Sequence, residues 1–160
     1  MASQCKCIFQ SKLKNVISTV TGLKQVIKFK DGAPRGTICA TSAFQAPGSY
    51  GYEVNMKIKK VKTAVGFLKE GKTTEYMRDT ALSEPHVSMG GAGWIHPKEI
   101  AASKKYVEGQ KVKVEVNFDL HKVTFYVDGH AAGEDEWPYD TAFPAISADG
   151  GFCELEYNET

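Results

Sequence analysis

The sequence has no apolar run long enough to cross a membrane. No uninterrupted apolar segment of the 160-residue chain approaches the roughly 20 residues that a membrane-spanning helix needs. The first residues, Met1 to Cys5, also lack the basic segment and apolar stretch of a secretory signal. We therefore expect a cytoplasmic protein with no membrane partner.

Cysteine is scarce, and its spacing argues against metal sites and disulfide frameworks. Of the four cysteines, Cys5 and Cys7 form a C-x-C, whereas Cys39 and Cys153 lie singly inside apolar segments. Zinc sites are normally built from C-x-x-C pairs, and the sequence has none. Free cysteines behave as small apolar side chains in a reducing compartment. The sequence therefore predicts no metal, no cofactor and reduced thiols.

The sequence also has no large excess of positive or negative charge. The net charge of +1 argues against a nucleic-acid partner. The charge is nevertheless uneven, since residues 1–80 carry 14 Lys and Arg against 5 Asp and Glu, and residues 81–160 carry 6 against 14. The two halves of a two-layered fold interleave, so the sequence leaves open whether basic and acidic faces form.

The motifs of two common enzyme classes are absent. The sequence contains no G-x-S-x-G, the motif of serine hydrolases, and no H-x-x-x-H, which sets two metal ligands on one face of a helix. Glu154 and Glu156 share one face of a predicted strand, as paired carboxylates do in some jelly-roll glycosidases. Cys153, Leu155 and Tyr157 would occupy the core face of that strand, so we expect both glutamates to be solvated. We predict no catalytic residues, and a glycosidase using these glutamates is the weaker alternative.

Apolar and polar residues alternate along much of the chain with a period of two. From Lys111 to Asp119, every second residue is Val or Phe, which is typical of a half-buried antiparallel strand. Residues 73–110 and 130–142 break the pattern and are predicted as loops, with one helical turn after Pro97. We therefore expect a single all-β domain over residues 1–160. The other predicted strands are residues 6–9, 15–20, 25–30, 50–59, 63–68, 123–127, 143–148 and 152–157.

Three segments resemble the SPRY (B30.2-like) domain family in content and order. GSYGYEV, which starts at Gly48, and the later AVGF are similar to the family's strand pair, an aromatic-Glu-Val strand and a strand ending in Val-Gly. VEVNFDLHKVTFYVDG, which starts at Val114, resembles the family's central hairpin, and FPAIS, which starts at Phe143, resembles its closing strand. The resemblance is clearest over residues 36–157.

The chain departs from the family pattern at a few positions. Tyr52 and Thr63 stand where the family usually has tryptophan, and the Leu-Asp-Pro motif of the longer B30.2 form is absent. The sequence is thus similar to a divergent, stand-alone member. The resemblance implies a bent, concanavalin-like sandwich of two antiparallel sheets, whose loops at one end recognise a partner protein or a short peptide.

Arginine and tryptophan are rare, and all four such residues lie in segments that we predict as loops. Aromatic and arginine side chains supply most interface hot spots. We predict a groove lined by Tyr76, Trp94 and Trp137, in which Arg35 or Arg78 anchors a carboxylate. The candidate partner-binding residues are Arg35, Tyr76, Arg78, Asp79, Trp94, His96, Trp137, Tyr139 and Asp140.

The loop around Trp137 is the strongest candidate. The acidic residues Glu134 to Glu136 beside it favour solvent exposure, although a tryptophan in such a loop can also pack as a lid over the edge of the core. A lectin-like sandwich remains an alternative, with Trp137, Tyr139 and Asp140 contacting a sugar. The lack of an Asp-rich calcium loop argues against it. We expect a monomer, and the sequence leaves open whether its partner offers a linear peptide or a folded surface.

Overall fold

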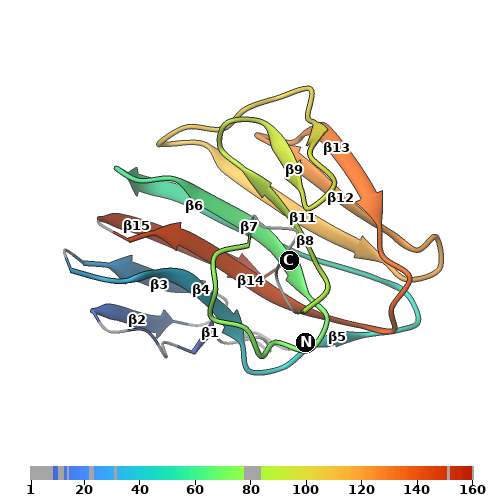
Figure 1. Ribbon diagram of the computed structural model, residues 1–160, viewed down its shortest axis with the longest axis horizontal. Helices are drawn as coiled ribbons and strands as arrows, with labels where there is room; N and C mark the ends of the chain where they lie inside the picture. The colour runs from blue at the N-terminus through green and yellow to red at the C-terminus, as the bar shows by residue number, and fades with distance from the viewer. Residues whose placement is uncertain are drawn as a thin grey trace.

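The computed structural model describes residues 9–10, 13, 15–21, 24–30, 32–77, 84–150 and 152–159. Over these residues two antiparallel sheets pack face to face as a sandwich (Figure 1). No helix that could span a membrane occurs in the part of the chain so described. The predicted all-β, two-sheet architecture is confirmed.

The eight-stranded sheet has the order β1-β4-β14-β7-β8-β9-β10, and β5 pairs with β14 at one end. Its members are β1 (Phe9–Gln10), β4 (Arg35–Ala40), β5 (Phe44–Gln45), β7 (Thr63–Leu68), β8 (His86–Gly90), β9 (Trp94–His96), β10 (Ile100–Ala101) and β14 (Thr141–Asp149).

The seven-stranded sheet has the order β13-β12-β11-β6-β15-β3-β2. Its members are β2 (Val16–Thr21), β3 (Lys24–Phe29), β6 (Ser49–Lys59), β11 (Lys111–Asn117), β12 (Lys122–Val127), β13 (His130–Glu136) and β15 (Cys153–Glu159).

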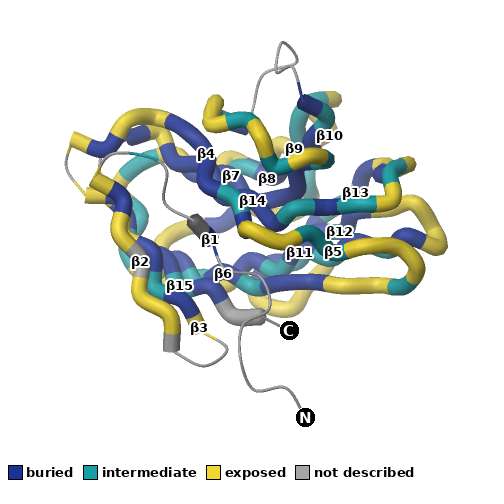
Figure 2. Tube along the Cα trace, turned by 90° about the horizontal axis from the view of Figure 1, so that it is seen from below, coloured by how far each residue is buried: buried dark blue, intermediate teal, exposed yellow. Residues whose placement is uncertain are grey.

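Alternate side chains of these strands fill the space between the sheets. In β11, Val112, Val114 and Val116 are fully buried, and the residues between them are partly exposed. This is the arrangement that a period of two places on a pleated strand. Figure 2 shows buried segments in dark blue along β4, β7 and β6, where the two layers meet. Removal of this apolar surface from water is the main driving force for folding.

Residues 69–77 cover the outer face of the eight-stranded sheet, so β7 is buried on both sides. Met77 is fully buried in a small apolar cluster on this face. Its backbone amide donates to the Ser147 hydroxyl (3.0 Å), and its carbonyl accepts from the Ser88 hydroxyl (2.8 Å). These bonds tie the connection to β14 and β8 and thereby position the neighbouring Tyr76.

A buried carboxylate holds the first part of this connection. Glu84 is 6% exposed. Its two carboxylate oxygens accept hydrogen bonds from the backbone amides of Glu70, Gly71, Lys72 and Thr73, at 2.5, 2.6, 2.9 and 2.9 Å. Hydrogen bonds to a charged acceptor are stronger than neutral ones. The residue that precedes β8 is thus joined to the segment that follows β7.

The expectation of loops is wrong in both segments, 73–110 and 130–142. The first contains β8, β9 and β10, which are too short for apolar alternation to identify. Residues 130–136 form β13, which pairs with β12; this edge strand of small and acidic residues also lacks apolar alternation. In place of a helical turn after Pro97, the chain reverses and β10 pairs with β9. Of the predicted strand at residues 6–9, only Phe9 lies among the described residues, in β1.

Candidate functional site

Two hollows lie along strands β8 and β9. The first, of about 450 Å³, lies where β8 begins and β9 ends. The second, of about 280 Å³, surrounds the end of β8 and the turn into β9. The prediction of one groove is therefore wrong, because Tyr76 and Trp94 line the second hollow whereas Trp137 lines the first.

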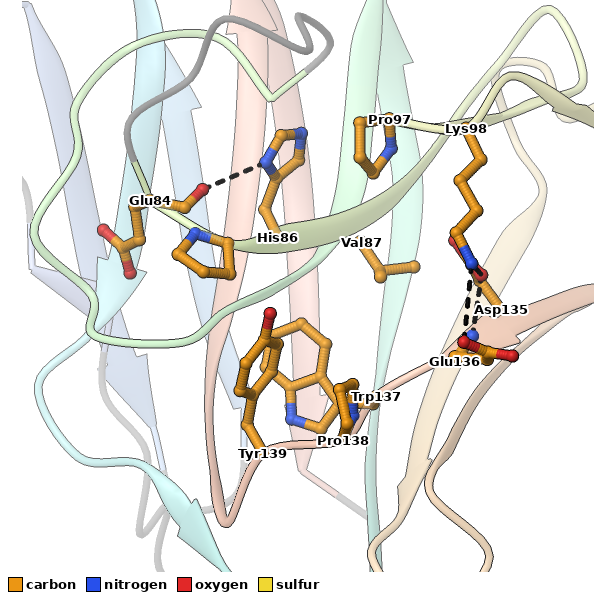
Figure 3. A pocket seen from close by; sticks show the side chains of 11 residues that line it. Glu84, His86, Val87, Pro97, Lys98, Asp135, Glu136, Trp137, Pro138 and Tyr139 are labelled. Atoms are coloured by element: carbon orange, nitrogen blue, oxygen red, sulfur yellow. Dashed lines mark hydrogen bonds and ion pairs between the residues drawn. The ribbon is translucent and has the colours of Figure 1, made fainter.

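The first hollow combines proline, aromatic and charged side chains from three segments of the chain (Figure 3). In that view Trp137 and Tyr139 lie on one side of the hollow, and His86 and Pro97 lie on the other. The hollow is lined by Glu84, Pro85, His86, Val87, Pro97, Lys98, Asp135, Glu136, Trp137, Pro138 and Tyr139.

Trp137 belongs to the core and is not an exposed contact residue. Its side chain has no exposed surface, and the indole Nε1–H donates to the Thr141 carbonyl (3.0 Å). Its ring packs on Phe67 and, edge to face, on Tyr139, with centroids 6.2 and 5.1 Å away. A buried tryptophan whose N–H has a partner is stable at the edge of a core. The loop exposes Glu134, Glu136 and Pro138 as predicted, but Trp137 itself packs as a lid over the core edge, which was the alternative.

Asp135 is also buried, against expectation. The residue is 7% exposed, and its Oδ1 lies 3.2 Å from the Lys98 Nζ and accepts from the Glu136 backbone amide (2.7 Å). The hydrogen bond with Asp135, together with the charges of both carboxylates, raises the pKa of Lys98. This ion pair keeps a buried carboxylate compensated and closes one side of the first hollow.

Of the predicted partner-binding residues in the lining of the first hollow, Tyr139 is the one whose side chain remains partly exposed. It is partly buried, and the Lys69 Nζ lies 4.9 Å from its ring centroid, within the range of a cation–π contact. Asp140 is exposed and lines neither hollow, and its backbone carbonyl accepts from the Ala46 amide (2.9 Å).

The second hollow presents the most exposed large aromatic side chain near β8. Trp94, the first residue of β9, is 47% exposed. His96 of the same strand and Tyr76 stand beside it in the lining. The hollow is lined by Lys59, Lys62, Thr63, Tyr76, Gly90, Gly91, Ala92, Trp94, His96 and Glu99.

Arg35 lies next to this hollow and already holds a carboxylate of its own chain. It opens β4 and is not in a loop, and its Nε lies 3.1 Å from Asp149 Oδ1. Its guanidinium lies 4.6 Å from the centroid of the Tyr76 ring. The predicted association of Arg35 with Tyr76 is thus present. Arg78 and Asp79 lie outside the described residues.

Several lining residues escaped the sequence prediction, among them His86, Lys98, Lys59 and Lys62. No local pattern marks them, because they meet only when β6, β8 and the segment after β9 come together. A run of lysines ending at Lys62 and the glycine-rich turn at residues 90–93 were both visible in the sequence. Their proximity was not.

The paired glutamates of β15 face away from both hollows. Glu154 lies 3.6 Å from Lys28, and Glu156 lies 3.7 Å from Lys24 and 3.4 Å from Lys57. Cys153, Leu155 and Tyr157 occupy the core face of β15, as expected. Neither glutamate lines a hollow, so the arrangement offers no cleft for acid–base chemistry. Within the described residues, no group of three or more His, Cys, Asp or Glu side chains could hold a metal ion.

No protein-family model matches the sequence, and no curated protein sequence matches it. In structure the chain is similar to the SPRY domain of human HERC1, with a TM-score of 0.73 and 12% identity over 96% of this chain and 98% of that chain. The chain has a SPRY-like fold. The resemblance drawn from the three sequence segments is therefore confirmed at the level of the fold.

Two further structures extend this comparison. The TRIM65 PSpry domain matches this SPRY-like chain with a TM-score of 0.63 and 11% identity, over 99% of this chain and 93% of that chain. A sialidase matches with a TM-score of 0.55 and 13% identity over 94% of this chain but only 16% of its own. At such identities the likeness concerns the fold alone.

Proposed function

We propose that this chain is a non-catalytic module that binds a partner protein through the surface formed by the two hollows, termed here the β8–β9 surface. One observation carries the proposal: Trp94 is 47% exposed and stands in the lining of the second hollow. An exposed tryptophan flanked by concave, partly apolar surface is typical of a binding hot spot.

A segment of the partner would lie across β8 and β9 and place side chains in both hollows. The first hollow offers Tyr139 and the proline rings, and the second offers Trp94 and Tyr76. Because the sandwich holds these groups on strands and short connections, little order has to be gained on binding. We further propose that the protein is monomeric and resides in the cytoplasm.

The carbohydrate-binding alternative loses its main residue. It required Trp137 to stack on a sugar ring, but this side chain is fully buried. Tyr139 and Asp140 alone do not form the flat, exposed platform that sugar stacking needs. We therefore favour a protein partner.

The test is affinity capture from a cytosolic extract, followed by binding measurements with the purified candidate partner. We compare the wild type with Trp94→Ala and with Ile17→Ala, whose isoleucine is 52% exposed on β2 at the far edge of the other sheet. Equal melting temperatures establish equal folding. We expect Trp94→Ala to weaken the purified complex at least about tenfold, with Ile17→Ala unchanged. Equal binding by all three proteins would refute the assigned surface.

A further inference from the structure

We infer that the second hollow recognises an acidic segment, in which carboxylate side chains meet Lys59 and Lys62 and an adjacent apolar side chain packs on Trp94. The inference rests on the proposed function and names the chemistry of the partner. It follows from the charge, the shape and the aromatic content of the hollow.

The two lysines in the lining have no acidic partner among the described residues. Their neighbours on the same stretch of chain are compensated, since Lys57 lies 3.4 Å from Glu156 and Lys60 lies 3.6 Å from Glu108. No ion pair involves Lys59 or Lys62 in the described part of the chain. Two lysines without an ion pair among the described residues therefore line the same small hollow.

Glycine lets one of these amines approach the backbone. A Cβ placed on Gly91 would lie 3.2 Å from the Lys59 Nζ and 3.1 Å from its Cε, so that any larger residue would push the lysine aside. The same Nζ lies 5.9 Å from the Tyr106 ring centroid. The amine is thus held against the turn that borders the hollow instead of extending freely into solvent.

A third lysine borders the same turn. Gly93 has a φ of +91°, and a Cβ there would lie 3.1 Å from Lys105 Cγ. Lys105 does not line the hollow, whose lining holds Lys59 and Lys62 and one carboxylate, Glu99. Carboxylates placed here would gain Coulomb attraction from several sides, at a surface where each pair is worth a modest amount.

The neighbouring hollow has the opposite character. Asp135 and Glu136 line it and share Lys98. A segment that crosses both hollows therefore has a preferred direction, with its acidic end at Lys59 and Lys62. Such local complementarity fixes register and rejects unsuitable partners.

The aromatic groups favour a peptide over a bare polyanion. Trp94 offers its exposed ring directly beside the lysines, and Tyr76 is engaged by Arg35. An acidic peptide with an apolar residue would use the cations and the ring together. The whole chain has a net charge of only +1, which gives little general attraction for nucleic acid.

The experiment uses three sets of immobilised peptides that share the same apolar positions and differ in the rest: Asp/Glu-rich, Lys/Arg-rich, and uncharged Ser/Gln-rich. The full chain is compared with Lys59→Glu/Lys62→Glu and with Lys111→Glu/Lys113→Glu. The second double variant makes the same charge change on β11 of the other sheet. Circular dichroism and melting temperature check the folding of all three proteins.

We expect the wild type to prefer the acidic set, with affinity that falls as salt is added. Lys59→Glu/Lys62→Glu should weaken this binding by about tenfold or more, while the β11 control retains it. Capture of acidic peptides by both double variants equally, or no capture of acidic peptides by the wild type, would overturn the inference. So would tighter binding of a single-stranded RNA oligonucleotide or of phosphatidylserine vesicles than of any acidic peptide.

A further pattern separates the two proposals. If uncharged or basic peptides bind, and Trp94→Ala abolishes that binding, the inference about acidic segments is wrong while the proposed function stands. If a purified partner binds equally to the wild type and to Trp94→Ala, the proposed function fails at this surface as well.

Discussion

The hydroxyl oxygen of Tyr52 in β6 lies 2.6 Å from the carbonyl oxygen of Gly66 in β7, a strand of the opposite sheet. It also lies 3.0 Å from the carbonyl oxygen of Ala145 in β14, the strand paired with β7. The side chain has no exposed surface. One tyrosine thus joins the two layers of the sandwich by a buried polar contact.

Tyr52→Phe should destabilise the fold while leaving its shape intact. The substitution removes the donor and leaves two buried carbonyl oxygens without this partner, a change that typically costs about 1–3 kcal/mol. We expect a lower midpoint in urea unfolding with an unchanged far-ultraviolet circular dichroism spectrum. Tyr50→Phe is the matched control, because its tyrosine is 40% exposed and its hydroxyl donates to the Pro47 carbonyl (3.1 Å) at an exposed site. Equal midpoints for both variants would contradict the role assigned to Tyr52.

Stability should fall in alkaline solution because of two buried tyrosines. Burial raises the pKa of Tyr52 and of Tyr106 in the folded state. The folded chain therefore favours the neutral phenols, so their contribution is complete below the unfolded pKa of about 10 and is lost as pH rises above it. Urea midpoints measured from pH 8 upward should decline more steeply for the wild type than for Tyr52→Phe. Parallel declines would show that Tyr52 is not responsible.

Glu84→Gln should loosen the connection that covers the outer face of the eight-stranded sheet. The amide group that replaces one carboxylate oxygen presents N–H groups to backbone donors, so two of the four hydrogen bonds made by residues 70–73 are replaced by repulsion. We expect faster hydrogen–deuterium exchange at these amides and a loss of about 2 kcal/mol in stability. Exposed Glu75→Gln serves as the control. Unaltered exchange at residues 70–73 would refute the role of Glu84 in holding this segment.

Cys153 should resist alkylation in the native protein. Its thiol is buried on the core face of β15, and burial raises its pKa to about 12. The thiolate is the reactive form, so iodoacetamide at pH 8 should modify Cys153 only after denaturation. Mass spectrometry of the peptide that contains it, before and after urea, measures this. Rapid native modification would mean that the start of β15 separates from β6 and β3 far more readily than its packing indicates.

The sequence was a good guide to strands but a poor one to exposure. The alternation in residues 111–119 specified both a strand and its buried face, because a pleated backbone turns successive side chains to opposite sides. The acidic residues before Trp137 suggested solvent, yet the indole is buried. Its burial depends on Phe67, which is distant along the chain and reaches it only through the packing of β7.

The sequence by itself determined the all-β architecture, the core faces of the alternating strands and the outward direction of Glu154 and Glu156. These follow from a local periodicity that β11 and strands like it carry independently of the rest of the chain. Only the tertiary structure decided that Lys59 lies against Gly91, that Arg35 is occupied by Asp149, and that the predicted groove is two hollows. Such pairings join residues far apart in sequence, and they arise from the order of strands and the closure of the two sheets, which no local pattern encodes.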